Sequence, residues 1–225
     1  MSARDTIAAI ATPPGTGGLG IVRISGPDVP AIARSIVGSL PKAREAVLAN
    51  FKNSADTVVD SGIALFFEAP HSFTGEHVLE LQGHGGQQVL QAVLRAVLEQ
   101  GVRLARPGEF SERAYLNDKI DLVQAEAIAD LIESGTEAAA RAAQRSLQGV
   151  FSREVNALQS QLTDLRVFVE AAIDFPEEEV DFLADSDVMQ RLGQVIIAVS
   201  ELLAEARRGC LLRDGLQLAI IGRPN

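Results

Sequence analysis

The chain is 225 residues long, with 47% hydrophobic and 22% charged residues, and this composition excludes an intrinsically disordered protein. Its formal net charge of −10 argues against a surface built mainly to bind nucleic acid, which needs clustered basic side chains. A single cysteine, Cys210, excludes an intrachain disulfide, and no apolar run reaches the roughly 18 residues that span a bilayer. Since the first residues also lack the regions of a signal peptide, we expect a cytoplasmic protein without membrane contact.

Residues 1–118 have the pattern of a mixed α/β domain. One helix is predicted over 29–37, ahead of Gly38. A second follows the GHGG stretch, where apolar residues recur on one helical face until Gly101 ends the helix. Short apolar stretches indicate the strands, which are expected at 6–12, 20–25, 62–67, 77–81 and 102–105.

From Asp118 onward the chain is predicted to be helical. Asp118 is interpreted as the N-cap of a helix that ends at Glu133, and Thr136 as the cap of a longer helix over 138–174. Near-heptad spacing marks an apolar seam along the longer helix, made of Leu147, Phe151, Val155, Leu158, Leu162, Leu165 and Val169. A last helix is predicted over 188–207. The long seam needs a packing partner, and we expect part of it to lie beyond this sequence.

The last ten residues have the pattern of a strand that enters a phosphate-binding loop. An apolar run at 216–221 leads directly into Gly222, Arg223, Pro224 and Asn225. A P-loop, G-x-x-x-x-G-K-[ST], also follows a buried strand, and here its first glycine and three spacer residues are present. Taken alone, the four residues fit an ordinary turn better. Together with the resemblance described below, they predict the front portion of a larger nucleotide-hydrolysing protein.

Three charged residues are candidate ligand contacts. Arg23 and Glu80 each lie within an apolar strand, where they either face water or line one cleft. In a cleft, the carboxylate can accept paired hydrogen bonds from an amidine-like heterocycle edge, and the arginine offers a fork of donors. Lys119 lies between the two parts of the chain and is either a solvated lysine or a contact for an anionic ligand tail.

Other polar features carry less weight. The spacing of Gly15, Gly17 and Gly20 matches a dinucleotide-binding loop, but this loop leads into a strand and not a helix, so we interpret it as a flexible β-loop. The glutamate-rich stretch 177–181 is interpreted as a solvated first helical turn. No Ser-His-Asp or Cys-His arrangement supports a covalent nucleophile. Metal-ligand spacing is also missing among the three histidines, His71, His77 and His84.

Several longer stretches are specific enough to indicate a family. They are DTIAAIATPPGTGGLGIVRISG, FTGEHVLELQGHGG, RPGEFSERAYLNDKIDLVQAEAIADLI, EAAIDFPEEEVDFL and LLRDGLQLAIIGRPN. In order and spacing they closely resemble the MnmE (TrmE) family of tRNA modification GTPases, over nearly the whole chain. The resemblance implies an α/β (α+β) domain that binds 5-formyl-tetrahydrofolate, or a related one-carbon folate, and forms the homodimer. An all-α helical domain follows, into which a Ras-like G domain that binds GTP, Mg²⁺ and K⁺ is inserted. With a flavoprotein partner, MnmG, the family modifies C5 of the wobble uridine of tRNA.

The resemblance also assigns residues. It places Arg23, Glu80 and Lys119 on folate contacts, with Glu80 expected to hold the pterin edge and the two cations to hold carbonyl or carboxylate oxygens. It places Gly222 and Asn225 in the GTP-binding loop, with Asn225 also a potassium ligand. The family's P-loop Lys and Ser and its reactive cysteine do not match any residue here, so we expect these 225 residues to lack GTP hydrolysis and any catalytic residue.

The sequence therefore predicts three parts: a folate-binding and dimerisation domain at 1–118, the first part of a helical domain at 119–213, and the start of a G domain at 214–225. Two other functions remain open. One is a folate-dependent one-carbon transferase that completes its chemistry in the α/β domain, and the other is a non-catalytic dimerisation scaffold built on the long helix.

Overall fold

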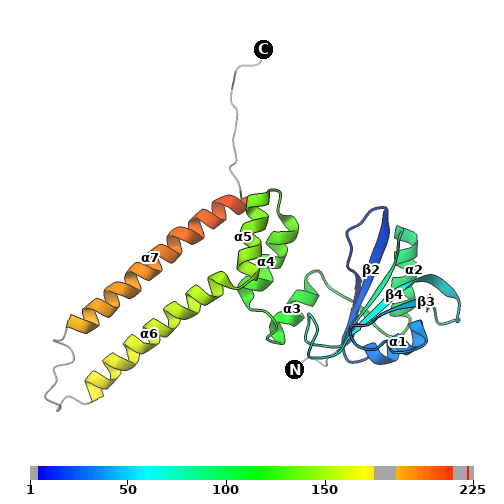
Figure 1. The fold of residues 1–225 in the computed structure, drawn as a ribbon, viewed down its shortest axis with the longest axis horizontal. Helices are drawn as coiled ribbons and strands as arrows, with labels where there is room; N and C mark the ends of the chain where they lie inside the picture. The colour runs from blue at the N-terminus through cyan, green and yellow to red at the C-terminus, as the bar shows by residue number, and fades with distance from the viewer. Residues whose placement is uncertain (1–4, 175–185, 215–221, 223–225) are drawn as a thin grey trace. The chain divides into compact units, whose positions relative to one another are not determined.

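The computed structural model describes residues 5–174, 186–214 and 222, and it divides the chain into two compact units, one up to Ile120 and one from Asp121 on (Figure 1). The first unit is a mixed sheet with helices, and the described part of the second unit is helical. The predicted fold class, an α/β domain followed by a helical one, is confirmed.

The first unit is built on one six-stranded sheet with the order β3-β4-β5-β2-β1-β6. Neighbouring strands are antiparallel except β1 and β6, which run parallel. The strands are β1 (Ile7–Ile10), β2 (Gly17–Ser25), β3 (Ala46–Lys52), β4 (Val58–Phe67), β5 (Val78–Gly85) and β6 (Arg103–Leu104).

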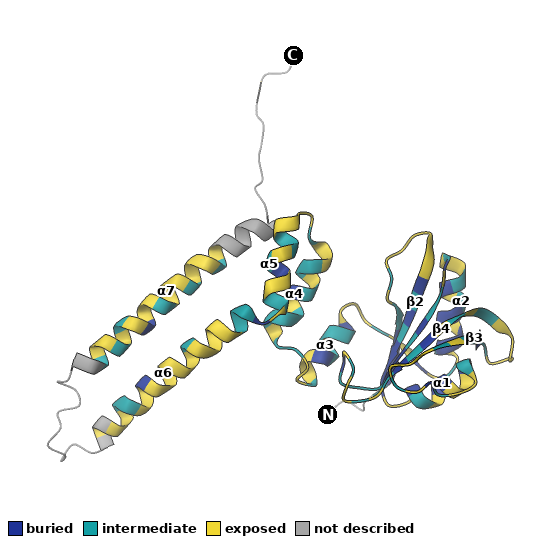
Figure 2. Cartoon of the chain, viewed as in Figure 1, coloured by how far each residue is buried: buried dark blue, intermediate teal, exposed yellow. Residues whose placement is uncertain are grey.

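Helices α1 (Val29–Val37) and α2 (Gln87–Leu98) pack on one face of this sheet and form the main core (Figure 2). The buried side chains of α1 recur every three or four residues, and the helix ends at Gly38, whose φ of 87° suits a glycine. The core residues contributed by the two central strands are Val22, Ile24, Leu79 and Leu81. Because successive strand residues point to opposite faces, the residues between them lie on the face opposite α1 and α2.

Most elements of this unit follow the sequence prediction. Helix α1 spans the predicted residues, and the glycine loop leads into β2, as expected for a β-loop. Two elements were missed. Strand β3 is rich in alanine and polar residues, which have little strand preference. Helix α3 (Glu109–Leu116) buries only Glu109 and Ala114, so its sequence has no apolar stripe that would predict a helix.

The second unit contains α4 (Leu122–Glu133), α5 (Glu137–Leu147), α6 (Val150–Asp174) and α7 (Ser186–Asp214). Helices α4 and α5 pack together, and the long helices α6 and α7 pack together (Figure 1). The prediction that Thr136 caps a helix is confirmed, because its hydroxyl accepts a hydrogen bond from the backbone N–H of Ala139 at 3.1 Å.

Two helix predictions are wrong. The N-cap of α4 is Asp121 and not Asp118, because Asp118 has a left-handed φ of 55° whereas an N-cap needs extended backbone. Asp118 instead closes the end of α3, where its N–H donates to the carbonyl of Tyr115. The predicted helix over 138–174 is also interrupted, because Gly149 adopts a φ of 72° and separates α5 from α6.

The apolar seam of the second unit is only partly covered. On α6, Leu165 is buried, but Leu162 is 53% exposed and Val155 is 36% exposed. On α7, Val195 is buried while Ile196 and other apolar residues are exposed (Figure 2). The expectation that this seam needs a further partner stays a prediction.

Within the described residues, no helix is long and apolar enough to cross a membrane. The predicted strand at 216–221, the acidic stretch 177–181 and Asn225 all lie outside those residues. Cys210 belongs to α7.

Candidate ligand-binding site

Arg23 and Glu80 lie directly opposite each other on neighbouring strands. They are register partners on β2 and β5, and both point to the sheet face opposite α1 and α2. The Nε and Nη2 atoms of Arg23 both donate to one carboxylate oxygen of Glu80, Oε1, at 2.9 and 2.8 Å. The other oxygen, Oε2, accepts from the side-chain amide of Gln82 at 3.1 Å. The sequence left open whether these two residues face water or line one cleft, and the structure places them opposite each other and pairs them.

The pair is partly shielded from solvent. The side chain of Arg23 is 31% exposed and that of Glu80 is 13% exposed. A charge-assisted pair of this kind is stronger than a fully exposed one, and both groups still present atoms to the outside. This combination suits a site in which a ligand replaces or adds to the existing hydrogen bonds.

A strip that is apolar except for Gln82 runs beside the ion pair on the same sheet face. The register places Leu48 opposite Ile63, Ile63 opposite Gln82, and Gln82 opposite Ile21, so one row crosses four strands. Leu48 is 82% exposed and Ile63 is 40% exposed. A flat heterocycle has an apolar face and a polar edge, so an exposed apolar strip next to a carboxylate matches both of its surfaces.

Two aromatic rings lie close to the Arg23 guanidinium. Its Cζ atom is 5.9 Å from the ring centroid of Phe73 and 5.8 Å from that of Phe110. These distances are within the range of cation–π attraction. Phe73 belongs to the loop between β4 and β5, residues 68–77, and Phe110 to the first turn of α3. Neither ring was singled out from the sequence.

The loop 68–77 is fixed by buried polar contacts. Thr74 is fully buried, and its hydroxyl lies 2.7 Å from the hydroxyl of Ser25 on β2. Ser25 also donates to the Glu76 carboxylate at 2.7 Å, and Asn117 donates to the carbonyl of Thr74 at 2.7 Å. Because these groups are satisfied inside the fold, the loop holds Phe73 in one place.

Lys119 contacts the same loop. Its Nζ donates to the carbonyl of Pro70 at 3.0 Å, and its stem passes close to Gly75. A Cβ on Gly75 would lie 3.2 Å from the Cγ and Cδ atoms of Lys119, so the glycine leaves room for the lysine. The structure therefore connects Arg23 and Lys119 to one loop, through Phe73 and Pro70, but gives no direct contact between Lys119 and the Arg23–Glu80 pair.

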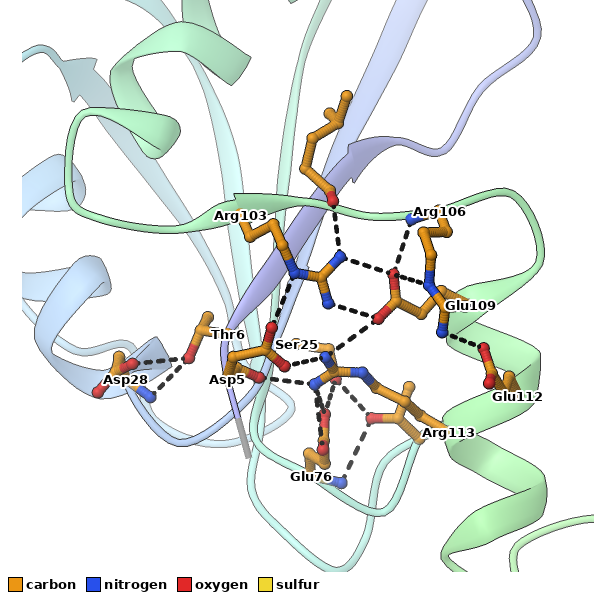
Figure 3. A network of polar contacts seen from close by, with 12 residues as sticks. Asp5, Thr6, Ser25, Asp28, Glu76, Arg103, Arg106, Glu109, Glu112 and Arg113 are labelled. Atoms are coloured by element: carbon orange, nitrogen blue, oxygen red, sulfur yellow. Dashed lines mark hydrogen bonds and ion pairs between the residues drawn. The ribbon is translucent and has the colours of Figure 1, made fainter. Parts of the chain in front are cut away.

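A network of ion pairs joins α3 to the sheet (Figure 3). Glu109, which is 3% exposed, accepts from Arg103 on β6 at 2.7 Å and from Arg113 at 3.3 Å. The hydrogen bond from Arg103 outweighs the opposing effect of burial and lowers the pKa of Glu109 to about 2. Arg113 also reaches Asp5 at 2.6 Å and Glu76 at 3.2 Å. The network thus ties Phe110, through α3, to the loop that carries Phe73.

A second polar pair lies at the far end of β5. The Nδ1 atom and the backbone N–H of His84 lie 2.7 and 2.8 Å from the two carboxylate oxygens of Asp60, whose side chain is 7% exposed. Burial raises the pKa of Asp60, but the hydrogen bonds from His84 outweigh it and lower the pKa overall. The sequence showed no metal-ligand spacing for His84 and did not predict its partner, which is 24 residues away.

The remaining residues singled out from the sequence are Gly222, Asn225 and the histidines. Gly222 is exposed, and Asn225 lies outside the described residues, so the nucleotide and potassium positions stay predictions. His77 accepts from the backbone N–H of Ala69 and stacks on Phe66, which is a structural role. Among the described residues, no group of three or more His, Cys, Asp or Glu side chains is placed to hold a metal ion.

Together the fold and the site define a two-part chain, with a sheet domain that carries a candidate ligand-binding face and a helical unit after it. Residues 6–119 match the family described as the GTP-binding protein TrmE N-terminus, and residues 122–217 match the MnmE helical domain. The chain therefore belongs to the MnmE (TrmE) family, as the sequence predicted.

Individual relatives agree with this assignment. The chain is 59% identical to the tRNA modification GTPase MnmE of Marinobacter nauticus, over 99% of this chain and 49% of that protein. It is 60% identical to the protein of the same name from Stutzerimonas stutzeri and 55% identical to that from Proteus mirabilis, in each case over the whole chain and 50% of the relative. The chain thus spans about half the length of these relatives.

Proposed function

We propose that this chain binds a one-carbon tetrahydrofolate, such as 5-formyl-tetrahydrofolate, on the face of its sheet opposite α1 and α2. The observation that supports this most is the Arg23–Glu80 pair beside an exposed apolar strip. The ligand fits the chemistry of these groups. Its pterin ring has an amidine-like edge that a carboxylate can bind through paired hydrogen bonds, and its glutamate tail carries carboxylates that an arginine or a lysine can bind.

Each residue has a separate role in the proposal. Glu80 accepts from the pterin edge, Arg23 donates to a carbonyl or carboxylate oxygen, and Lys119 meets the anionic tail. Since Glu80 Oε1 already accepts twice from Arg23, a ligand that engages Glu80 competes with at least one of those bonds. The ammonium group of Lys119 gives one of its three N–H donors to the carbonyl of Pro70, so two remain for a ligand.

Calorimetric titration with 5-formyl-tetrahydrofolate tests the site. Saturable binding is expected, with a loss of about 10-fold or more in affinity for Glu80→Ala, because truncation removes the carboxylate that accepts from the pterin edge. Glu45→Ala is the matched control, because Glu45 pairs with Lys42 on an exposed surface. Absence of saturable binding, or unchanged binding by Glu80→Ala, refutes the folate proposal.

For the whole protein, we propose the activity in the name of the relatives, a GTPase that acts in tRNA modification. The family resemblance adds the finer points: MnmG as partner, C5 of the wobble uridine as target, and GTP with Mg²⁺ and K⁺ in the G domain. In the sequence given, no Lys or Ser follows Gly222 at P-loop spacing, so these residues by themselves are proposed not to hydrolyse GTP. Phosphate release from GTP by the purified chain, measured against a no-protein blank, tests this last point.

The homodimer is proposed to form through the sheet unit. A second candidate is assembly through the helical unit, because α6 and α7 expose apolar side chains such as Leu162 and Ile196. Light scattering after size-exclusion chromatography distinguishes the two for the intact chain. Loss of the dimer in Leu48→Glu, with no loss in Ile196→Glu, supports the sheet unit, and the reverse result supports the helical scaffold.

A further inference from the structure

The Arg23 guanidinium is held in two different ways. In its plane, Nε and Nη2 donate to Glu80. Against its faces or edges lie the rings of Phe73 and Phe110, each within 6 Å of Cζ. Cation–π attraction acts on the charge as a whole and uses none of the N–H donors, so the rings do not compete with a ligand for hydrogen bonds.

This difference matters for a ligand that engages Glu80. When the ligand edge donates hydrogen bonds to Glu80, Arg23 loses part of its own hydrogen bonding to that carboxylate. The long, flexible side chain of Arg23 then has several rotamers available. A guanidinium that stays in contact with two fixed rings keeps its donors directed at the ligand. The rings therefore reduce the ordering cost that Arg23 would otherwise add to binding.

Both rings are themselves fixed by the fold. Phe73 is 39% exposed and contributes little to the core, but the neighbouring Thr74 is fully buried and hydrogen-bonded to Ser25. Phe110 follows Glu109, the buried centre of the ion-pair network of α3 (Figure 3). An exposed phenylalanine on a rigid loop, directed at a half-buried arginine, is unexplained by core packing alone.

We propose that Phe73 and Phe110 are positioning residues that hold the Arg23 guanidinium ready for the ligand. The proposal rests on the proposed folate site and names residues that act through Arg23, without touching the reacting part of the ligand.

The first test is a thermodynamic cycle with 5-formyl-tetrahydrofolate and the intact 225-residue chain. Phe73→Leu is expected to weaken binding by about threefold to tenfold, the range of a partly buried cation–π contact, whereas Phe73→Tyr keeps the ring and stays near wild type. In an Arg23→Lys background, adding Phe73→Leu is expected to cost less than about twofold, because the planar cation is already gone. Phe110→Leu is expected to behave in the same way.

Two outcomes overturn the proposal. Wild-type affinity in Phe73→Leu shows that the ring is not needed. An equal loss in the wild-type and Arg23→Lys backgrounds shows that the ring acts on the ligand directly. Thermal unfolding of each variant shows whether a loss comes from the fold instead, and a large drop in melting temperature restricted to Phe73→Leu also counts against the proposal.

A second measurement does not depend on the ligand. The heteronuclear NOE of the Arg23 Nε–Hε group, with the signal assigned by its disappearance in Arg23→Lys, reports how well the guanidinium is ordered, and it is expected to fall in Phe73→Leu and Phe110→Leu but not in Phe73→Tyr. If wild type fails to bind folate while these losses of order occur, the proposed function falls and the positioning of Arg23 stands. An unchanged NOE in both leucine variants removes the positioning role.

Discussion

Glu109, at the start of α3, accepts a hydrogen bond at 2.7 Å from Arg103 on β6, with only 3% of the glutamate exposed. The backbone N–H of Arg106 donates to the same carboxylate, also at 2.7 Å. A buried acid with this many donors stabilises the fold only while it is ionised. The relationship ties a short, polar helix to the end of the sheet, and the position of Phe110 depends on it.

Glu109→Gln is expected to lower the free energy of unfolding at pH 7 by about 2 kcal/mol, because the charged acceptor of several hydrogen bonds is lost. The sign of the pH dependence follows from the lowered pKa. The folded pKa is about 2 against an ordinary 4.5, so the stabilisation is present above pH 4.5 and is lost as the pH falls toward 2. Urea unfolding at about pH 7 and about pH 3.5 measures both effects, and the gap between wild type and variant is expected to narrow at the lower pH.

Glu112→Gln is the control for this prediction. Glu112 lies on the same helix and pairs with Arg106 at 2.7 Å, but its side chain is 48% exposed. Exposed pairs contribute little, so a change within about 0.5 kcal/mol is expected. Equal losses in Glu109→Gln and Glu112→Gln would show that burial of Glu109 is not what matters.

Gly75→Ala is expected to destabilise the loop that joins Lys119 to the sheet unit. Its φ of 75° costs a non-glycine residue about 1 kcal/mol, and its new Cβ would press on Asn117 and on the Lys119 stem at 3.2 Å. Gly101→Ala has only the first of these effects, the cost of a positive φ, because Gly101 has a φ of 83° but nothing within 4 Å of a Cβ. Thermal unfolding is expected to show a larger loss for Gly75→Ala, and identical losses would mean that Lys119 and Asn117 simply move aside.

The parts of this fold that could be predicted from sequence are those whose signal is local. In α1, the apolar spacing and the closing glycine lie within a few residues of each other, and the cap at Thr136 is likewise next to the helix that it begins. Both predictions are confirmed. Strand β3 and helix α3 carry no such local pattern, because their positions are set by a strand partner and by ion pairs to distant residues. Tertiary contacts of this kind override local preference.

The candidate site shows the same limit. Arg23 and Glu80 could be marked as charged residues inside apolar strands, but their pairing depends on the register of β2 and β5, 57 residues apart. The sequence gives no indication of a role for Phe73, because a phenylalanine in a loop belongs to no helical or strand pattern. Its proposed role follows only from its position next to Arg23. The prediction that Asp118 is the N-cap of α4 is wrong for a related reason. Its residue type fits an N-cap, and only the backbone conformation, which the sequence does not state, excludes it.

Gly83→Ala is expected to separate Asp60 from His84. A Cβ on Gly83 would lie 2.1 Å from Oδ2 of Asp60, so the carboxylate must move and lose hydrogen bonds to His84. A loss of about 1–2 kcal/mol in the free energy of unfolding is expected, since a buried carboxylate is left with fewer donors. Gly18→Ala is the control, because a Cβ there meets nothing within 4 Å.

Gly62→Ala tests a clash with backbone atoms, whereas Gly83→Ala tests a clash with a side chain. A Cβ on Gly62 would lie 2.1 Å from the carbonyl oxygen of Gln82, which belongs to the β5 ladder and cannot rotate away. Chemical unfolding is therefore expected to show a larger loss for Gly62→Ala than for Gly83→Ala. If both variants unfold alike, β4 and β5 are more loosely paired than the register indicates.

Asp121→Ala is expected to weaken α4 by about 1 kcal/mol, the usual effect of losing an N-cap. Asp121 accepts from the N–H of Gln124 at 2.8 Å, and the Gln124 side chain accepts from the N–H of Asp121 at 3.0 Å, so one substitution breaks a reciprocal pair. Asp118→Asn is the control, because asparagine tolerates the left-handed backbone of that position and no cap is lost. Helix content by circular dichroism and the midpoint of thermal unfolding measure the effect. If Asp118→Asn is the more damaging of the two, the cap of α4 has been assigned to the wrong aspartate.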